Sequence, residues 1–246
     1  MLRTPIRILA LLVTFVCALA QAQTVDEVLS KHYAALGGLD NLKALTSMKT
    51  SGKMVMGGGM EAPFTSVNTR PNSVRFEVTF QGKAAVSAYD GKTAWMLNPF
   101  MGSSDPEVMP KEEADDFTED ADFDGPLVDY KEKGSTIEYA GKEDVEGSDA
   151  HKLKLTLKNG KVRFFYLDAD SYLILKTTQK VTRGGQEIEV ASFPGNYKKI
   201  GNVIQPYSVE QKVNGKTASQ MTFDTIELNA TVDKSVFAMP AKAEKK

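Results

Sequence analysis

The chain has 246 residues, of which 25% are charged and 41% belong to the hydrophobic set, and its formal net charge is −2. This composition is typical of a folded globular protein and excludes wholesale disorder and a protein with many membrane spans. Without a basic excess, the usual non-specific binding to nucleic-acid phosphates is also excluded. Two histidines and one cysteine are too few for a zinc cluster built from those residues.

The first 22 residues have the three parts of a secretory signal peptide. A basic start with two arginines precedes an apolar run from 8 to 19 and a small-x-small cleavage site, Ala20-Gln21-Ala22. The apolar run is shorter than the roughly 20 residues that a transmembrane anchor needs. Cys17 follows Val16, whereas a lipoprotein signal has a small residue before its cysteine. We therefore expect a cleaved, periplasmic protein that is not a lipoprotein.

Helical periodicity is clearest between residues 24 and 45. Thr24 and Glu27 have the spacing of a capping box, and the apolar residues that follow recur on one face. Gly37-Gly38 ends this helix, and a short second helix is expected from Leu39 to Leu45.

From Met48 onward, short β-prone runs alternate with turn signals. Asp-Gly or Asn-Gly pairs, which favour tight hairpins, occur at 90–91, 159–160 and 214–215. Their spacing predicts about ten to twelve antiparallel strands in one meander. The prediction is therefore a single domain over 23–241, followed by a charged, disordered tail over 242–246.

The strands alternate polar and apolar residues, as in the run 152–158, so one face of the sheet is apolar. The meander is interrupted by the acidic stretch 99–125, in which a short helix is expected over 111–122. If the sheet curls, its apolar face becomes a cavity that the helices cover incompletely, and such a cavity suits an acyl chain.

Three patterns resemble catalytic or nucleotide-binding motifs, but none has the required context. Gly-Lys-Thr at 91–93 resembles the end of a P-loop, yet Val86 stands where the first glycine is required. The segment 148–151 contains Ser, Asp and His, but neighbours on one strand do not converge as a triad must. His32 lies on the apolar stripe of the first helix, where a packed histidine is expected. We predict no catalytic residue, no cofactor and no enzymatic activity.

Two further segments keep two interpretations each. The run Asp-Ala-Asp-Phe-Asp-Gly at 120–125 matches the start of a calcium loop, but Lys131 stands where the bidentate glutamate is required. A solvated acidic loop is the alternative, and no metal site is predicted. Met54, Met56 and Met60 flank three glycines and are either core residues or a mobile lip over an apolar cavity.

Several motifs, in order along the chain, resemble the LolA/LolB lipoprotein-carrier superfamily. Thr-Arg-Pro-Asn at 69–72 is followed at 90–100 by Asp-Gly-Lys-Thr-Ala-Trp-Met-Leu-Asn-Pro-Phe. The closing Asp…Phe…Pro pattern falls at 233–240, and the opening segment 32–45 is similar to a branch labelled outer-membrane lipoprotein-sorting proteins. The resemblance covers most of the chain after the signal peptide.

The resemblance implies a mainly β fold, an unclosed antiparallel barrel of about eleven strands, with the N-terminal helix and the short helical insert as a lid. In carriers of this family the cavity takes the acyl chains of a lipoprotein. Arg70 matches the arginine that holds the lid to the barrel by hydrogen bonds; a solvent-facing strand end is the alternative. Val74 stands where the carriers have a bulky aromatic that guards the cavity.

Trp95 and Phe100 match aromatic residues of the family, and each is either a ligand contact or ordinary core. The residues predicted to bind ligand or hold the lid are Arg70, Val74, Trp95, Phe100, Met54 and Met56.

The function implied is a monomeric periplasmic carrier or chaperone that holds acyl chains and exchanges them with lipoprotein-handling proteins of the inner or outer membrane. The alternative is a sensor or regulatory module that uses the same fold to detect lipid or mislocalised lipoprotein, with the acidic segment 105–124 as its partner surface. An enzyme is the third and least supported class. The sequence does not identify the cargo.

Overall fold

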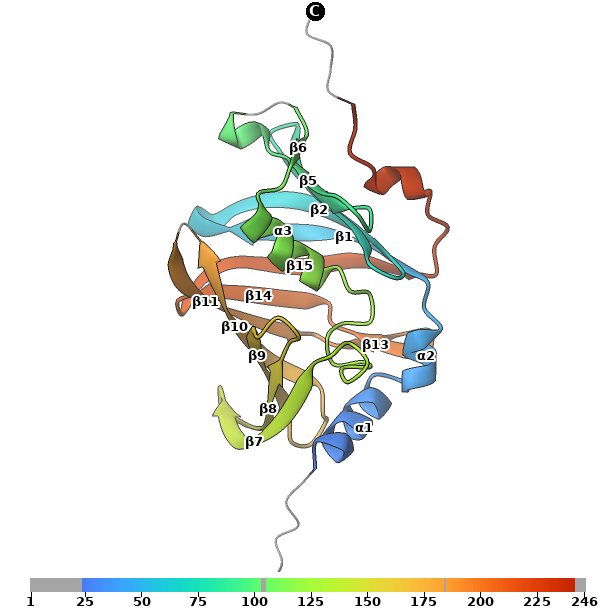
Figure 1. The fold of residues 1–246 in the computed structure, drawn as a ribbon, viewed down its shortest axis with the longest axis vertical. Coiled ribbons are helices and arrows are strands. Elements are labelled where there is room, and N and C mark those ends of the chain that lie inside the picture. Colours follow the sequence, from blue (N-terminus) through green and yellow to red (C-terminus); the bar gives the residue numbers. More distant parts are fainter. Residues whose placement is uncertain (1–23, 103–104, 184, 242–246) are drawn as a thin grey trace, which may run out of the picture.

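The structure is a computed structural model that describes residues 24–102, 105–183 and 185–241 (Figure 1). The predicted signal peptide (1–22) and charged tail (242–246) lie outside the described residues. None of the helices in the described part is both long and apolar enough to span a membrane.

One antiparallel sheet of thirteen strands dominates the fold, and it does not close into a barrel. Its strands, in spatial order from one edge to the other, are β6 (Glu107–Val108), β5 (Ala94–Leu97), β4 (Lys83–Tyr89), β3 (Ser73–Phe80), β2 (Met60–Thr69), β1 (Ser47–Met56), β15 (Lys216–Leu228), β14 (Ser208–Val213), β11 (Gln186–Gly195), β10 (Ile174–Arg183), β9 (Val162–Asp168), β8 (Ser148–Thr156) and β7 (Thr136–Val145). A separate hairpin consists of β12 (Lys198–Ile200) and β13 (Val203–Gln205).

The sheet consists of two meanders joined in the middle. The chain runs from β1 outward to the edge strand β6, then crosses to the opposite edge and returns from β7 to β15, which pairs with β1 along nine Cα pairs. The predicted open, mainly β fold is confirmed, with thirteen strands in the main sheet instead of about eleven. At the predicted 214–215 turn, Asn214 and Gly215 have φ of 47° and 76°, the left-handed geometry that a tight hairpin turn needs.

Two helices precede the sheet, as expected. Helix α1 (Val25–Ala35) begins with the predicted capping box, in which Thr24 and Glu27 bond each other's backbone amide. Gly37 ends it with φ of +106°, and a side chain there would collide with the backbone of β13, so glycine is required on both counts. Helix α2 (Leu39–Lys43) follows, while α3 (Lys111–Asp120) is the predicted helix of the acidic insert.

The helices cover one face of the sheet, which we call the inner face. Val28 and Leu29 of α1 pack into the core cluster with Leu153, Leu155 and Phe165. In Figure 1, α3 lies across the middle strands, and its nearest strand neighbours are β5 and β10, from the two halves of the sheet. The insert therefore lies over the space that the curled sheet leaves open.

Three short 3-10 turns complete the described fold: η1 (Gly57–Gly59) between β1 and β2, η2 (Pro99–Met101) after β5, and η3 (Lys234–Phe237) after β15. Phe237 of η3 is buried on the opposite, outer face. The last segment of the described chain therefore covers the outer face of β3–β5.

Candidate ligand-binding site

An aromatic cluster lies on the inner face at the centre of the sheet. The Phe64 ring contacts Phe76 and Phe223, with ring centroids 5.7 and 5.5 Å apart, and Phe64 is buried. Gly52 is paired with both Phe64 and Phe223, and a side chain at Gly52 would press on the Phe64 ring and on the backbone of β15. None of these residues belongs to a motif in the sequence; the one local signal is Gly52, because a glycine inside a strand is the usual sign of a close approach.

The methionine hairpin continues this apolar strip. Met54 and Met56 are half-buried, and their strand partners Ala62 and Met60 have the same parity as Phe64, so all of them face the inner side. Met60 is 39% exposed. The predicted Met54 and Met56 thus lie at the end of the apolar strip.

Phe100 lies at the same end of the sheet. It belongs to η2, is 49% exposed, and packs edge-on against Phe80 with 5.9 Å between ring centroids. The β1–β2 and β3–β4 hairpins and the end of β5 all meet at this edge because their strands are antiparallel neighbours. Together with Met60 and the 82% exposed Met101, Phe100 forms an apolar rim.

Val74 also faces the inner side and is buried. Two positions further along the same face of β3 stands Phe76, a member of the aromatic cluster. The inner face of β3 therefore carries an aromatic side chain, but two residues after Val74 and not at the position of Val74.

Trp95 points the other way. Trp95 is paired with Ala88 of β4 and lies on the same face as Ala88. Ser87, the residue next to Ala88, lines the cavity beneath α3 on the inner face, so Ala88 and Trp95 lie on the outer face. Its indole Nε1 donates a hydrogen bond to the carbonyl of Phe237 at 2.7 Å, and the side chain is 1% exposed. Of the two roles considered for Trp95, this geometry corresponds to ordinary core.

Arg70, at the end of β2, joins two segments that cover the inner face. Its guanidinium forms a two-pronged ion pair with Asp124, in which Nη2 lies 2.6 Å from Oδ1 and Nη1 bonds Oδ2. The same group donates to the carbonyl of Leu42 at 3.0 Å and to that of Leu45. These bonds satisfy a guanidinium that is about three-quarters buried, with 26% of the side chain exposed.

The segment that follows α3 is held at the same point. The Arg70 Cζ lies 5.0 Å from the centroid of the Phe123 ring, and the Phe123 amide donates to the carbonyl of Pro71 at 3.1 Å. We call α3 together with the segment 121–128 the lid. Arg70 therefore contacts the lid through the Asp124 carboxylate and the Phe123 ring, and the α2 region through the carbonyls of Leu42 and Leu45.

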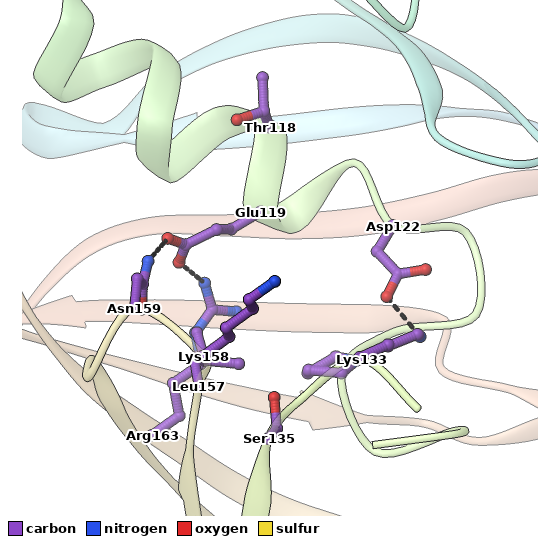
Figure 2. A pocket seen from close by; sticks show the side chains of 10 residues that line it. Thr118, Glu119, Asp122, Lys133, Ser135, Leu157, Lys158, Asn159 and Arg163 are labelled. Carbon is purple, nitrogen blue, oxygen red and sulfur yellow. Dashed lines mark hydrogen bonds and ion pairs between the residues drawn. The ribbon is translucent and has the colours of Figure 1, made fainter. Parts of the chain in front are cut away.

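A second set of ion pairs fixes the C-terminal half of α3 to the β8–β9 hairpin. Lys161 bonds Asp116 at 2.7 Å and Glu119 at 2.8 Å, and Arg163 bonds Asp120 at 2.7 Å. Arg163 also bonds Glu119 at 3.1 Å (Figure 2). Burial opposes the charge of Lys161, but the bonds to Asp116 and Glu119 outweigh it and raise the pKa of the ammonium. The helix is thus attached ionically as well as by packing.

These attachments account for the calcium-like run. Asp120 bonds Arg163, Asp122 bonds Lys133 at 2.5 Å, and Asp124 bonds Arg70. The three carboxylates thus turn to three cations on different elements and do not surround a common point. Within the described ranges, no group of three metal-ligating side chains could hold a metal ion.

Three cavities lie between the helices and lid and the inner face of the sheet. One of about 440 Å³ lies beneath α3 and adjoins another of about 170 Å³; both share Gln179, Val190 and Gln211, and their walls are largely polar. A third, of about 250 Å³, lies beneath α1, α2 and segment 123–128. Its mainly apolar lining includes Tyr33, Leu36, Leu42, Leu45, Met48, Phe123, Leu127, Phe165 and Ile174.

Arg70 bridges the walls of this third, apolar cavity. Leu42 and Leu45 line one wall and Asp124 another, and all three accept hydrogen bonds from the Arg70 guanidinium. Arg70 therefore links both α2 and the lid to the end of β2.

Both histidines have packing roles in this geometry. His32 is buried, and its Nδ1 lies 2.8 Å from the carbonyl of Tyr172, to which it donates. His151 is buried too; it bonds the hydroxyl of Tyr139 at 3.1 Å and stacks on the Tyr172 ring. Ser148 is three residues before His151 on one strand and faces away from it. No serine triad forms there.

A scan against protein-family models found no match for the chain, and a search of curated proteins found none either. Solved structures do match, and they define the class of fold. A DUF1329 family protein from Desulfovibrio piger superposes with a TM-score of 0.61 at 12% identity, covering 88% of this chain and 98% of that one.

Two further matches carry names from the family expected from the motifs. A LolA superfamily protein from Nitrosomonas europaea has a TM-score of 0.57 at 12% identity, covering 88% of this chain and 98% of that one. A domain described as an outer membrane lipoprotein-sorting protein from Vibrio parahaemolyticus has a TM-score of 0.56 at 12% identity, covering 86% and 94%. The chain therefore has a LolA-like fold, as its motifs predicted.

Proposed function

We propose that the protein is a periplasmic carrier or chaperone that binds lipid or the acyl chains of a lipoprotein and catalyses no reaction. The observation that carries the proposal is the apolar inner face beneath a lid that Arg70 holds in place. The LolA-like fold supports it, because proteins named for lipoprotein sorting share that fold. The signal-peptide pattern supports export to the periplasm.

The energy for such binding comes from burying chain methylenes. Each buried CH₂ contributes about 0.8 kcal/mol, so an acyl chain needs few polar contacts to bind. The aromatic cluster of Phe64, Phe76 and Phe223 and the hairpin residues Met54 and Met56 provide an apolar strip of this kind.

The closed geometry requires the lid to move before cargo enters. The apolar cavity of about 250 Å³ lies below the roughly 300–1,000 Å³ of typical ligand pockets. Opening the lid would join this cavity to the inner-face strip. We therefore propose that the structure is the closed state and that Arg70 stabilises it.

The acidic segment 105–124 is less suited to a partner surface than the sequence suggested. The carboxylates of Asp116, Glu119 and Asp120 bond cations of β8–β9, and Asp124 bonds Arg70. Glu112 and Glu113 line the cavity beneath α3. No specific observation favours the sensor alternative, so the carrier is the function proposed, with the monomer as its working form.

The test is lipid content and lipid uptake. Native mass spectrometry of protein isolated from a periplasm should show bound lipid, and delipidated protein should take up a fluorescent fatty acid. Phe76→Ser on the inner face should reduce uptake several-fold, whereas Thr79→Ser on the outer face of the same strand should not. Absence of both lipid and uptake in the wild type would refute the proposal.

A further inference from the structure

A groove of about 510 Å³ lies outside the proposed acyl site, between the end of α3, the turn 129–135 and the β8–β9 hairpin (Figure 2). Its walls carry three cations, Lys133, Lys158 and Arg163, and two carboxylates, Glu119 and Asp122. Nothing in the proposed binding of an acyl chain uses these charges.

Both carboxylates are already bonded. Glu119 accepts bonds from Asn159 at 2.5 Å, from Arg163 and also from Lys161, while Asp122 bonds Lys133. No ion pair or hydrogen bond joins the Lys158 ammonium to any other residue that the structure describes. In Figure 2 its nitrogen points into the groove. Of the five charged residues that line the groove, Lys158 is therefore the one whose charge is not paired with another described residue.

Lys158 is exposed, and its stem passes beside the turn that contains Gly134. Its aliphatic stem lies over Gly134, where an added Cβ would be 3.3 Å from the Lys158 Cδ. Gly134 has φ of +78°, a conformation that a side chain would disfavour. Because Gly134 has no side chain, the Lys158 stem can lie close to the turn with its ammonium in the groove.

Further donors surround the same space. The Ser135 side chain points into the groove in Figure 2. Arg163 is 11% exposed, and its Nε is buried without a hydrogen-bond partner among the described residues. Such a donor is costly to leave unmatched. Ammonium, hydroxyl and guanidinium groups together are the donors that bind phosphate and carboxylate in proteins.

The groove also adjoins the apolar cavity. Pro126 lines both the groove and the 250 Å³ apolar cavity. Pro126 and Arg163 also both line the 170 Å³ cavity described above. A head group in the groove and an alkyl tail in the apolar cavity would therefore lie on either side of segment 123–128.

We propose that this groove is a binding site for an anionic group, a phosphate or a carboxylate, with Lys158 as its principal contact and Lys133, Ser135 and Arg163 around it. The anion is either free or the head group of an amphiphile whose tail enters the apolar cavity; the amphiphile form rests on the proposed function.

The experiment uses delipidated full-length mature protein and four probes: inorganic phosphate, dodecyl phosphate, dodecanoate and uncharged dodecanol. Calorimetry at low salt should show dodecyl phosphate and dodecanoate binding about tenfold more tightly than dodecanol, as expected for one charge-assisted contact. Lys158→Gln should remove most of this preference and leave dodecanol binding unchanged. Lys92→Gln, a lysine in the exposed 91–93 turn, is the matched control and should change nothing.

The outcomes separate the two proposals. If dodecanol binds and the anionic probes gain nothing from Lys158, the anion site is wrong while the acyl site stands. If dodecanol fails but inorganic phosphate binds in a Lys158-dependent way, the groove is a site for a free anion and the proposed acyl binding is wrong. If inorganic phosphate does not bind and the charged chains show no preference, the inference is overturned.

Discussion

At the scale of single residues, Arg70 is the most connected side chain of the candidate site. One guanidinium bonds the carboxylate of Asp124 and the carbonyls of Leu42 and Leu45. Only arginine has the planar set of donors for these directions, since a lysine ammonium is a single point. The motif around residue 70 indicated the arginine, but Asp124 could not be distinguished from its acidic neighbours by sequence.

Removing Arg70 should loosen the lid and destabilise the fold. Arg70→Leu is expected to lower the free energy of unfolding by about 2–3 kcal/mol, because the bonds lost involve a partly buried charge. Arg70→Lys should recover only part of the loss. Urea unfolding measures the loss in the free energy of unfolding, and the backbone amides of 121–128 should exchange hydrogen faster in Arg70→Leu than in the wild type.

The matched control is Arg75→Leu, which removes an arginine of equal exposure that pairs with Glu77 on the outer face. It should cost less than Arg70→Leu, because Arg75 has one carboxylate partner and one long bond to the Val236 carbonyl, and it should leave exchange in the lid unchanged. A double-mutant cycle of Arg70→Leu with Asp124→Leu should give a coupling energy above about 1 kcal/mol. Additive effects would show that the ion pair does not hold the lid.

His32 makes stability depend on pH. Burial disfavours the charged ring and lowers the pKa of His32 below its usual 6.5, and burial lowers the pKa of His151 as well. The unfolded chain therefore binds a proton first as the pH falls. Stability is fully present above about pH 6.5 and is lost as the pH falls below that value toward the lowered pKa.

We expect urea unfolding to give a lower free energy of unfolding at pH 5.5 than at pH 7.5. His32→Asn retains a donor for the Tyr172 carbonyl and should weaken this dependence. Carboxylates such as Asp168, whose pKa is lowered by hydrogen bonds from Ser171, contribute to acid instability only below about pH 4. A rise in stability on acidification would contradict the assignment.

At the scale of elements, α3 depends on its surroundings. It has ten residues, its N-cap Pro110 makes no side-chain cap bond, and its last turn has no basic residue. Isolated helices of this length are marginal, and acidic groups in a last turn oppose the helix dipole. Lys161 and Arg163 of the β8–β9 hairpin supply the missing positive charge.

Arg163→Gln should therefore loosen α3 more than the strands. Amide exchange across 111–120 is expected to rise about fivefold, equivalent to roughly 1 kcal/mol, and a similar rise should appear in wild-type protein at 1 M salt. Lys154→Gln, which removes an ion pair between β8 and Glu138 of the neighbouring β7, is the control and should leave α3 unchanged. Equal exchange in both variants would mean that packing alone holds α3.

At the scale of the whole molecule, the two halves of the sheet are joined by β1 and β15, and the chain then crosses to the outer face. There η3 buries Phe237 beside Trp95, and the Trp95 indole bonds the Phe237 carbonyl. This packing covers β3–β5 on the side opposite to the lid. The outer face of β3–β5 is therefore covered by the end of the described chain, and the inner face of the sheet by the helices.

Phe237→Ala should test this closure. It is expected to lower the free energy of unfolding by about 3–4 kcal/mol, the usual cost of deleting a buried aromatic ring. The emission of Trp95, the one tryptophan, should shift to longer wavelength as water reaches it. Val236→Ala, on an exposed neighbour, should change neither property much. An unshifted spectrum in Phe237→Ala would show that η3 does not shield Trp95.

Local pattern was sufficient for the strands, turns, first helix and LolA-like motifs. Alternation and turn chemistry act over a few residues, so the open antiparallel sheet and the capping box at Thr24 could be read directly. The face on which a strand residue lies is different: it depends on register, and a shift of one residue reverses it. That is why Trp95 and Val74, similar as motif positions, lie on opposite faces.

Contacts between distant segments were decided by the tertiary fold. The acidic run 120–124 contains three aspartates that local sequence cannot tell apart, and each meets a different cation: Arg163, Lys133 or Arg70. Those cations come from separate elements that only folding brings to the lid. The same holds for the aromatic cluster and for Lys158 over Gly134, because the partners of each side chain are set by strand pairing and chain crossing, which no short window contains.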